Sequence, residues 1–363
     1  MNFDVRKLLS RAEELKEQIK EPIQVGEARI LVVGAGGAGN NSVTRLMGMG
    51  GAKGAKTISI NTDAQHLNFS KADSKILIGE QLTQGLGAGG YPEIGRQAAQ
   101  QSRNELRQKL RGAHLVFLTC GLGGGTGTGS LPVVAEIAKS EGAIVVASVT
   151  TPFDMEKARL YKAEEGLMEL RENCDTVIVI DNNKLVELVP HLPLNDAFAY
   201  ADNLIAGMIK GISETITTPS LVNLDYADIR TIMTGGGVAM IGVGEGTNAE
   251  ECVNCALKHP LIDVDATGGN GAIIHVSGGP SMTLAEVTKA SKMISSQLSP
   301  TAHVIWGARV DPTLGDKMRI MTIITGVNSP NIVGKNSKFE PRIMLPDEAK
   351  PEMLQELCID YVS

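Results

Sequence analysis

The sequence predicts an α/β fold in which a doubly wound parallel sheet is followed by a long helix and a second, smaller α/β unit. From Arg29 onward, short apolar runs alternate with helical or glycine-rich segments. This alternation is typical of a parallel sheet whose strands are joined by helices. Apolar residues at helical spacing then define one long helix, roughly 196–217, and the order of strands and helices changes after it.

Five apolar runs are the predicted strands of the first unit: 30–33, 57–60, 115–118, 144–149 and 176–180. Runs of this length, bounded by turn residues, indicate buried strands. For the second unit we expect strands near 238–243, 271–277, 303–310 and 318–325, with helices near 248–258 and 283–297. The predicted domains are therefore an N-terminal helical extension (1–28), the first unit (29–195), the central helix (196–218), the second unit (219–328) and a tail (329–363).

Both ends of the chain carry short apolar patterns among charged residues. The extension 1–28 is amphipathic, and its polar face mixes both charge signs, so packing on the protein is favoured over membrane binding. The tail ends in a short apolar peptide with Leu354, Leu357 and Ile359. Docking onto a partner and packing on the body are about equally favoured for this peptide.

Composition narrows the class of protein. A net charge of −7 without a lysine-rich run argues against nucleic acid as the main partner. Aromatic residues make up 3% of the chain, too few for a platform that stacks single-stranded bases. Five scattered cysteines fit a reducing compartment. Because no stretch approaches 18 apolar residues and no secretory signal is seen, we expect a soluble cytoplasmic protein without direct membrane insertion.

A glycine-rich loop, 121–129, follows the predicted strand 115–118 and precedes a predicted helix that starts near Ser130 and Pro132. Its backbone N–H groups are unshielded by side chains, and a helix N-terminus favours anions. The loop therefore predicts a phosphate cradle.

Two more glycine loops, 34–39 and 85–90, fall in the first unit. The first contains G-x-G-x-x-G after a strand, and Asn61 and Asp63 end the next strand. Alone, these features are compatible with a dinucleotide-dependent oxidoreductase. Three such loops could instead surround a triphosphate with backbone donors. The Gly-Lys at 334–335 is followed by asparagine, so the chain has no P-loop.

The segment G-G-G-T-G-T-G at 123–129 resembles the signature of the tubulin/FtsZ family. The resemblance covers roughly 29–327, and the N-terminal helix and terminal peptide look more archaeal than bacterial. It implies a GTP-hydrolysing cytoskeletal protein that polymerises head-to-tail and forms the cell-division ring, concentrated at the division site. It also implies that the terminal peptide docks on a membrane-anchoring division protein.

The resemblance assigns roles to individual residues. It implies contacts to the phosphates, γ-phosphate sensing by Gly87–Gly90, a ribose loop that includes Glu156 and Arg159, and guanine recognition by Asn182 and Asp202, with Phe198 beside the base. The full implied nucleotide set is Gly36, Gly37, Asn40, Asn41, Asp63, Gly87, Ala88, Gly89, Gly90, Gly123, Gly124, Gly125, Thr126, Gly127, Thr128, Gly129, Thr151, Pro152, Glu156, Arg159, Asn182, Phe198 and Asp202.

The chain departs from the family pattern in two places. The segment Glu156–Arg159 is one residue shorter than the family's E-G-x-x-R and lacks its glycine. Asp181 stands where the family has a proline before the guanine-reading asparagine, which would put a negative charge near the base. For Asp202 the chemistry agrees with the resemblance, because a carboxylate can accept from both N1–H and the 2-amino group of guanine, a pair of donors that adenine lacks.

The segment with Asn223, Asp225 and Asp228 is the implied catalytic segment, which positions the attacking water. Helix capping is the alternative interpretation of these residue types. About 20 helical residues separate Asp202 from Asp225, or roughly 30 Å. At this distance Asp225 and Asp228 cannot reach the γ-phosphate of a nucleotide whose base lies at Asp202. They should instead reach the nucleotide of the next subunit in a head-to-tail stack, so that hydrolysis depends on polymerisation.

Two further expectations concern function and metal. A tubulin-like scaffold that binds GTP with little hydrolysis is an alternative, although the acidic segment favours an enzyme. We expect Mg²⁺ to be held through the phosphates and water rather than by side chains. Cys252, Cys255 and His259 have the spacing of a half-site, but zinc needs four ligands, so no protein metal site is expected.

Overall fold

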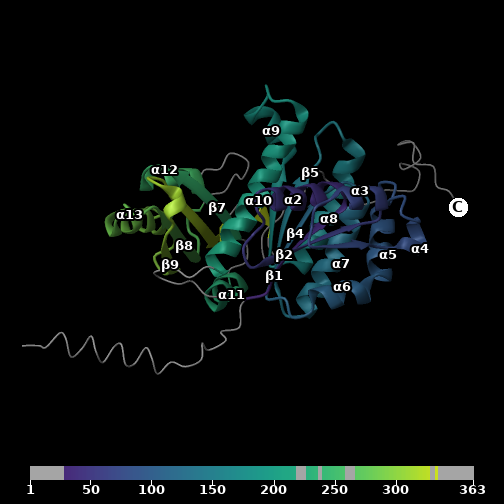
Figure 1. Ribbon diagram of the computed structural model, residues 1–363, viewed down its shortest axis with the longest axis horizontal. Helices are drawn as coiled ribbons and strands as arrows, with labels where there is room; N and C mark the ends of the chain where they lie inside the picture. The colour runs from purple at the N-terminus through teal and green to yellow at the C-terminus, as the bar shows by residue number, and fades with distance from the viewer. Residues whose placement is uncertain (1–27, 218–225, 236–238, 258–265, 328–331, 334–363) are drawn as a thin grey trace, which may run out of the picture.

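A parallel sheet of six strands forms the centre of the first unit (Figure 1). The computed structural model describes residues 28–217, 226–235, 239–257, 266–327 and 332–333. The strands are β1 (Ile30–Ala35), β2 (Ala55–Asn61), β3 (Ser74–Leu77), β4 (Leu115–Gly121), β5 (Ile144–Thr151) and β6 (Thr176–Asp181). Their order is 3-2-1-4-5-6, and all neighbouring pairs are parallel. The predicted fold class is confirmed.

Two strands of this sheet were missed by the sequence analysis. The first, β3, has four residues, of which only Ile76 is buried. The second, β11 (Ile332–Val333), lies in the predicted tail and pairs antiparallel with β6 at the edge of the sheet. Neither segment is long enough to show a strand pattern in the sequence.

The sheet separates two apolar cores because successive residues of a strand face opposite sides. In β1, Ile30 and Val32 join one core, whereas Leu31 and Val33 join the other. Helices α2 (Gly36–Gly48) and α10 (Leu194–Thr217) are among those that contribute to the first core. The second core is covered by α5 (Pro92–Gln101), α6 (Arg103–Leu110), α7 (Thr126–Ser140) and α8 (Lys157–Asn173). Shorter helices in this unit are α3 (Ala64–Phe69), α4 (Glu80–Thr83) and α9 (Asn182–Leu188).

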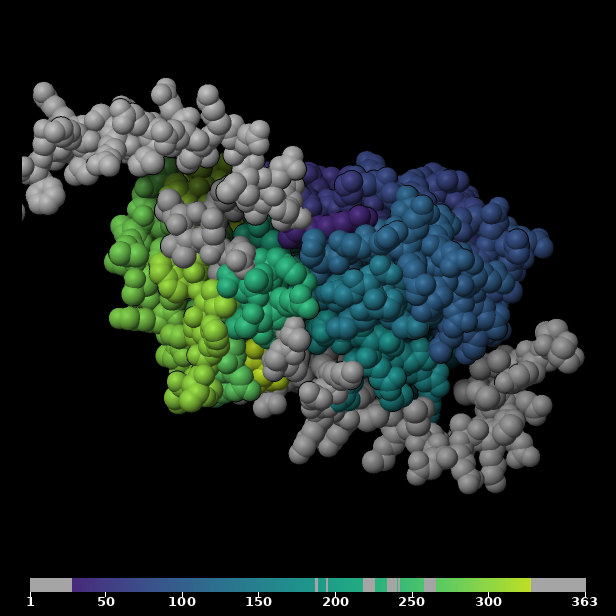
Figure 2. Space-filling view, turned by 90° about the horizontal axis from the view of Figure 1, so that it is seen from below, coloured from purple at the N-terminus to yellow at the C-terminus, as the bar shows by residue number. Residues whose placement is uncertain are grey.

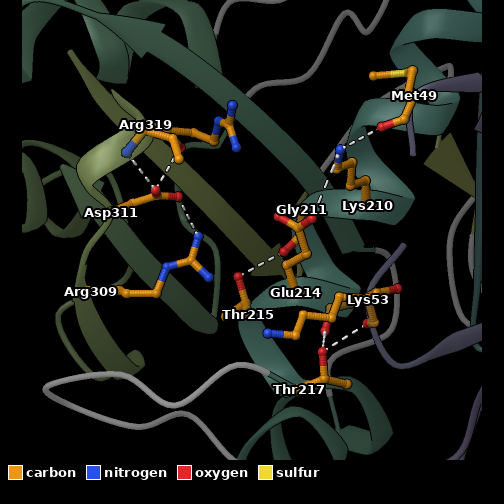
Figure 3. A network of polar contacts seen from close by, with 12 residues as sticks. Met49, Lys53, Lys210, Gly211, Glu214, Thr215, Thr217, Arg309, Asp311 and Arg319 are labelled. Atoms are coloured by element: carbon orange, nitrogen blue, oxygen red, sulfur yellow. Dashed lines mark hydrogen bonds and ion pairs between the residues drawn. The ribbon is translucent and has the colours of Figure 1, made fainter. Parts of the chain in front are cut away.

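The long helix α10 connects the two units and starts two residues before the predicted position. Its buried residues Ile205 and Ile209 share one continuous core with strands of both sheets. In its second half, two hydrogen bonds tie it to the first unit (Figure 3): Lys210 Nζ donates to the carbonyl oxygen of Met49 at 2.8 Å, and Thr217 Oγ1 donates to that of Lys53 at 2.8 Å. Helix α10 therefore fixes how the second unit sits on the first.

The second unit is a four-stranded mixed sheet in the order β7-β10-β8-β9, with antiparallel pairing except between β8 and β9. Its strands are β7 (Ala239–Gly246), β8 (Gly271–Gly278), β9 (His303–Val310) and β10 (Met318–Thr325). Its helices are α12 (Ala249–Leu257), α13 (Leu284–Ser295) and a short 3₁₀ turn, Pro312–Leu314; helix α11 (Tyr226–Gly235) precedes β7. In Figure 2 this unit, in green and yellow, lies beside the purple to teal first unit.

Several predicted segments lie outside the described residues: the N-terminal helix, Asn223, Asp225, His259 and the terminal peptide. Within the part of the chain that is described, no helix is both long and apolar enough to cross a membrane.

Candidate functional site

A cavity of about 1260 Å³ opens where β1 and β4 end, which is the point at which the strand order reverses. Connections leave β1 and β4 toward opposite faces of the sheet, so a crevice forms between them, and ligands of such sheets bind there. Fourteen of the predicted nucleotide residues line it: Gly36, Gly37, Asn41, Gly124, Gly125, Thr126, Gly127, Thr151, Pro152, Glu156, Arg159, Asn182, Phe198 and Asp202.

Helix α7 begins at Thr126, so the predicted start near Ser130 is wrong. Pro132 lies inside the helix. Glycines allow the early start, because their backbones pack where a side chain could not fit. A Cβ on Gly127 would lie 2.9 Å from Cys120 Cβ, and one on Gly129 would lie 1.8 Å from the carbonyl oxygen of Pro92. The first N–H groups of α7, which have no partner within the helix, are thereby brought to the cavity.

A second helix N-terminus reaches the same cavity. Gly36 opens α2 with φ of +68°, a conformation that glycine adopts freely. Gly34 and Gly39 allow α2 to lie directly on β1 and β4, since a Cβ on either would fall 2.3 Å from a carbonyl oxygen. Both helix dipoles therefore favour an anion at one place.

Asn40 lies behind the cavity wall rather than on it. The residue is fully buried. With its amide oriented to satisfy both ends, its nitrogen donates to Gly34 O at 2.9 Å and its oxygen accepts from Asn61 Nδ2 at 3.1 Å. This arrangement links the ends of β1 and β2, and Asn40, although expected in the nucleotide set, is not among the residues that line the cavity.

Segment 85–91, here called the flanking loop, lies beside the cavity without lining it. Asp63 and Leu86 form a β-bridge, and Ala64 N donates to Gly85 O at 3.0 Å. At Gly125, a Cβ would meet Ala88 Cβ at 2.8 Å. Asp63, Gly87, Ala88, Gly89 and Gly90 therefore lie beside the end of the cavity that Gly125 and the start of α7 line. Gly123, Thr128 and Gly129 likewise lie just outside its wall.

The other end of the cavity carries Asp202 on α10. Ser42 Oγ donates to Asp202 Oδ1 at 2.5 Å, which fixes the carboxylate. Burial raises the pKa of Asp202, while the bond from Ser42 and the charge of Arg45 act in the opposite direction. Phe153 and Phe198 stand nearby with ring centroids 6.0 Å apart, so the end beside Asp202 offers apolar ring surface as well as a carboxylate.

Buried polar atoms on the wall have no protein partner. These atoms are Thr151 Oγ1, Asn182 Oδ1 and His66 Nδ1, each of which is buried and makes no hydrogen bond within the protein. Buried polar atoms are nearly always hydrogen-bonded, so unpaired ones around one cavity indicate a polar ligand. The wall thus combines anion-binding backbone, an apolar surface and unpaired polar atoms, which fits a nucleotide.

The shortened segment 156–159 still reaches the cavity. Arg159 Nη1 lies 2.5 Å from Glu156 Oε1, and Glu156 Oε2 accepts from Phe153 N at 3.1 Å. Asp181 caps α9 instead, since its Oδ1 accepts from Asn183 N at 2.9 Å. Asp181 does not line the cavity, whereas the next residue, Asn182, does, so the expected negative charge near the base stays a prediction.

The described part of the acidic segment lies at the opposite edge of the sheet from the cavity, the edge at which the parallel strands begin. Asp228 is in the first turn of α11. Tyr226 Oη donates to the carbonyl oxygen of His114 at 3.0 Å, and the two rings meet edge to face with centroids 5.2 Å apart. His114 directly precedes β4, whereas the cavity lies at the other end of that strand. In Figure 1, α11 accordingly lies at the lower end of the sheet.

Family comparison decides what this architecture is. The Tubulin/FtsZ family GTPase domain matches residues 29–190, and the FtsZ family C-terminal domain matches 237–328. The chain belongs to the tubulin/FtsZ family. It is a GTPase of that family and binds GTP and GDP. The dinucleotide alternative is set aside, although the strand order is the same as in dinucleotide-binding sheets.

Archaeal relatives match most of the chain. Cell division protein FtsZ 2 of Methanocaldococcus jannaschii is 56% identical over 354 residues, or 96% of this chain and 92% of the relative. FtsZ 2 of Haloferax volcanii is 52% identical and covers 87% of this chain and 79% of its own length. A solved FtsZ dimer of M. jannaschii has a TM-score of 0.79 at 48% identity, covering 93% of this chain and 99% of that one.

The sequence analysis did not predict several other residues of the cavity wall. His66, Arg45 and Ser42 line the cavity, as do Asn195 and Asn203 near Asp202. His66 lies on α3, three residues after the Asp63 cap, and its ring faces Gly37. Helical spacing could have placed Asn195 and Asn203 near Asp202, but only the packing of α2 on α10 brings Ser42 and Arg45 there.

The Cys252 half-site does not assemble on α12. Cys252 is buried and its Sγ lies 3.3 Å from Met318 O, whereas Cys255 is exposed. The described residues contain no group of three or more His, Cys, Asp or Glu side chains placed to hold a metal.

Proposed function

We propose that the chain is a polymerising GTPase of cell division, which binds GTP in the cavity and hydrolyses it with the acidic segment 223–228 of a neighbouring copy. The observation that supports this is the position of α11. The length of β4 separates His114, to which Tyr226 is bonded, from the cavity, roughly 20 Å at the rise of a strand. Asp228 therefore cannot serve the nucleotide of its own subunit.

A head-to-tail contact resolves this separation. It would bring the α11 edge of one copy against the cavity mouth of the next, and such a heterologous contact repeats into an open filament. Hydrolysis would then remove the γ-phosphate at the contact that holds the filament together. The archaeal relatives are named cell division proteins, and one solved relative is described as a dimer.

Guanine is the base that the cavity supports best. Asp202 is fixed by Ser42 and can accept from N1–H and the 2-amino group together, and Asn182 offers an unpaired buried amide oxygen. The N-termini of α2 and α7 would take the phosphates. The carboxylates on the wall, Glu156 and Asp202, already have partners, so Mg²⁺ would be held through phosphate oxygens and water.

The remaining roles follow from the ends of the chain. The peptide with Leu354, Leu357 and Ile359 would dock on a membrane-anchoring division protein and concentrate a cytoplasmic filament at the division site. This segment lies outside the described residues. Its proposed role is therefore inferred from the sequence, in which a short apolar pattern ends a polar tail.

Mixing two inactive variants tests the shared active site. Asp202→Ala should lose the nucleotide but keep its acidic segment, and Asp225→Ala should bind GTP but lack the catalytic group. Each alone should be inactive. In an equal mixture, copies should follow one another in random order along the filament. About a quarter of the contacts then pair an intact cavity with an intact acidic segment, so about a quarter of the wild-type rate should return.

The outcomes separate the candidates. A mixture that stays inactive although both variants enter filaments, as judged by sedimentation, would contradict hydrolysis across the contact. A wild-type rate per subunit that does not change with protein concentration would do the same. A scaffold with little hydrolysis would show GTP-dependent filaments whose phosphate release is unchanged by Asp225→Ala.

A further inference from the structure

We propose that Lys162 on α8 is a positioning residue that holds the flanking loop 85–91 against the phosphate end of the cavity, and thereby sets the preference for GTP over GDP. This inference rests on the proposed nucleotide site and concerns how that site is kept in shape.

One ammonium group engages the end of the flanking loop in two ways. Lys162 Nζ donates to the carbonyl oxygen of Gly90 at 2.9 Å, and it stands 5.2 Å from the ring centroid of Tyr91. Hydrogen bonds from a charged donor are stronger than neutral ones, and a cation over an aromatic face adds attraction. Lys162 is half-buried while Tyr91 is exposed, so the contact is made from beneath the loop.

This end of the loop is held by one backbone hydrogen bond, from Tyr91 N to Ala88 O at 3.0 Å, which closes a turn over two glycines. Gly89 and Gly90 have φ of +60° and +82°, and the built Cβ of Gly90 meets nothing within 4 Å. Glycine in open space has many accessible conformations. The start of the loop is fixed differently, through the Asp63–Leu86 bridge and a bond from Gly87 N to Thr62 O at 3.1 Å. Lys162 therefore adds a side-chain restraint at the end of this turn, where the built Cβ of Gly90 meets no other group.

The same face of α8 also contacts the phosphate loop 121–129. Arg159, Lys162 and Gly166 are spaced at i, i+3 and i+7, so they share one face. A Cβ on Gly123 would lie 2.7 Å from Arg159 O, and one on Gly166 would lie 2.4 Å from Thr128 Cγ2. Helix α8 thus rests on both ends of the phosphate loop, and Lys162 extends from it to the flanking loop.

The geometry gives a specific consequence. Ala88 lies against Gly125, so the flanking loop borders the cavity where the phosphates are expected to end. A γ-phosphate would reach this border, whereas GDP would end before it. Loosening Gly89 and Gly90 should therefore weaken binding of a nucleoside triphosphate and leave the diphosphate nearly unaffected.

The experiment compares dissociation constants for GTPγS and GDP in Lys162→Gln, Lys162→Arg and the wild type, at protein concentrations below assembly. Loss of a charged hydrogen bond predicts that Lys162→Gln binds GTPγS roughly tenfold more weakly, with GDP affinity within about twofold of wild type. Lys162→Arg should restore the GTPγS affinity, since a guanidinium can donate to Gly90 O and stack on Tyr91. Lys139→Gln is the matched control, because Lys139 pairs with Asp175 from the last turn of α7, far from the flanking loop.

An equal weakening of both nucleotides, or no change in either, would overturn the inference. If Lys162→Gln lowers the melting temperature strongly, Tyr91→Leu replaces it, because this change removes the ring but leaves Gly90 in place. We expect Tyr91→Leu to raise the ratio of the GTPγS to the GDP dissociation constant in the same direction, but by less. A wild-type protein that binds neither nucleotide would instead contradict the proposed site itself. Wild-type binding with an unchanged ratio in both variants would refute only the role of Lys162.

Discussion

At the scale of single residues, Asp202 shows how a recognition group can reduce stability. Its carboxylate is taken out of water beside α2, and one hydrogen bond from Ser42 with the charge of Arg45 offsets only part of that loss, so the pKa remains raised. A raised pKa means that the folded state holds the proton more tightly than the unfolded state. The stabilisation that protonated Asp202 gives to the folded state is therefore complete below its ordinary pKa of 3.8, and it is lost as the pH rises through the raised pKa of the folded state.

Asp202→Asn should separate recognition from stability. Without nucleotide, we expect the variant to melt above wild type at pH 7, with the difference shrinking on acidification toward pH 4. GTP affinity should fall roughly ten- to a hundredfold, because an amide cannot accept from both guanine donors. Xanthosine triphosphate, which presents a carbonyl in place of the 2-amino group, should bind better than to wild type. A variant that melts below wild type at pH 7 would contradict the desolvation argument.

At the scale of elements, the glycine loops serve packing and binding at separate positions. Gly129 lies in α7 where the helix crosses Pro92 at the start of α5, and no side chain fits there. Gly124 lines the cavity, and its built Cβ meets nothing within 4 Å. The glycine-rich sequence of the loop does not distinguish these two positions, whereas the structure surrounds Gly129 closely and leaves Gly124 open.

Gly129→Ala and Gly124→Ala form a matched pair. Gly129→Ala should destabilise the nucleotide-free protein by about 3 kcal/mol, since backbone must move to admit the methyl group. Gly124→Ala should leave the free energy of unfolding within about 0.5 kcal/mol of wild type, yet weaken GTP binding by crowding the phosphates. Urea unfolding and nucleotide titration measure the two effects. Equal losses of stability would show that Gly124 is also a packing glycine.

At the scale of the whole molecule, the cavity and the described part of the acidic segment lie at opposite edges of one sheet. The edge with the cavity is built by the N-termini of α2 and α7, and the other edge holds α11 through the Tyr226–His114 contact. Helix α10 joins the edges and shares its core with both sheets, so their separation is set by rigid elements.

Tyr226→Phe should affect turnover without affecting binding. Removing the hydroxyl deletes the bond to His114 O and should cost about 1 kcal/mol of stability. We expect unchanged GTP affinity but a lower rate of phosphate release in filaments, because α11 would be less firmly placed for the neighbouring nucleotide. Tyr161→Phe, on the exposed side of α8, is the control. A weaker GTP affinity in Tyr226→Phe would contradict the separation of the two edges.

The sequence by itself determined the fold class, five of the six parallel strands and the glycine loops, because apolar runs and glycine clusters are local signals. It missed β3 and β11, which are too short to show a period, and it placed the start of α7 too late because Pro132 resembles a helix start. Tertiary structure alone decided which residues meet. Ser42 reaches Asp202, Asn40 turns into the core and Lys162 reaches Gly90, because packing joins residues up to 160 positions apart in the chain. No local pattern encodes such contacts, since they depend on where each helix crosses the sheet.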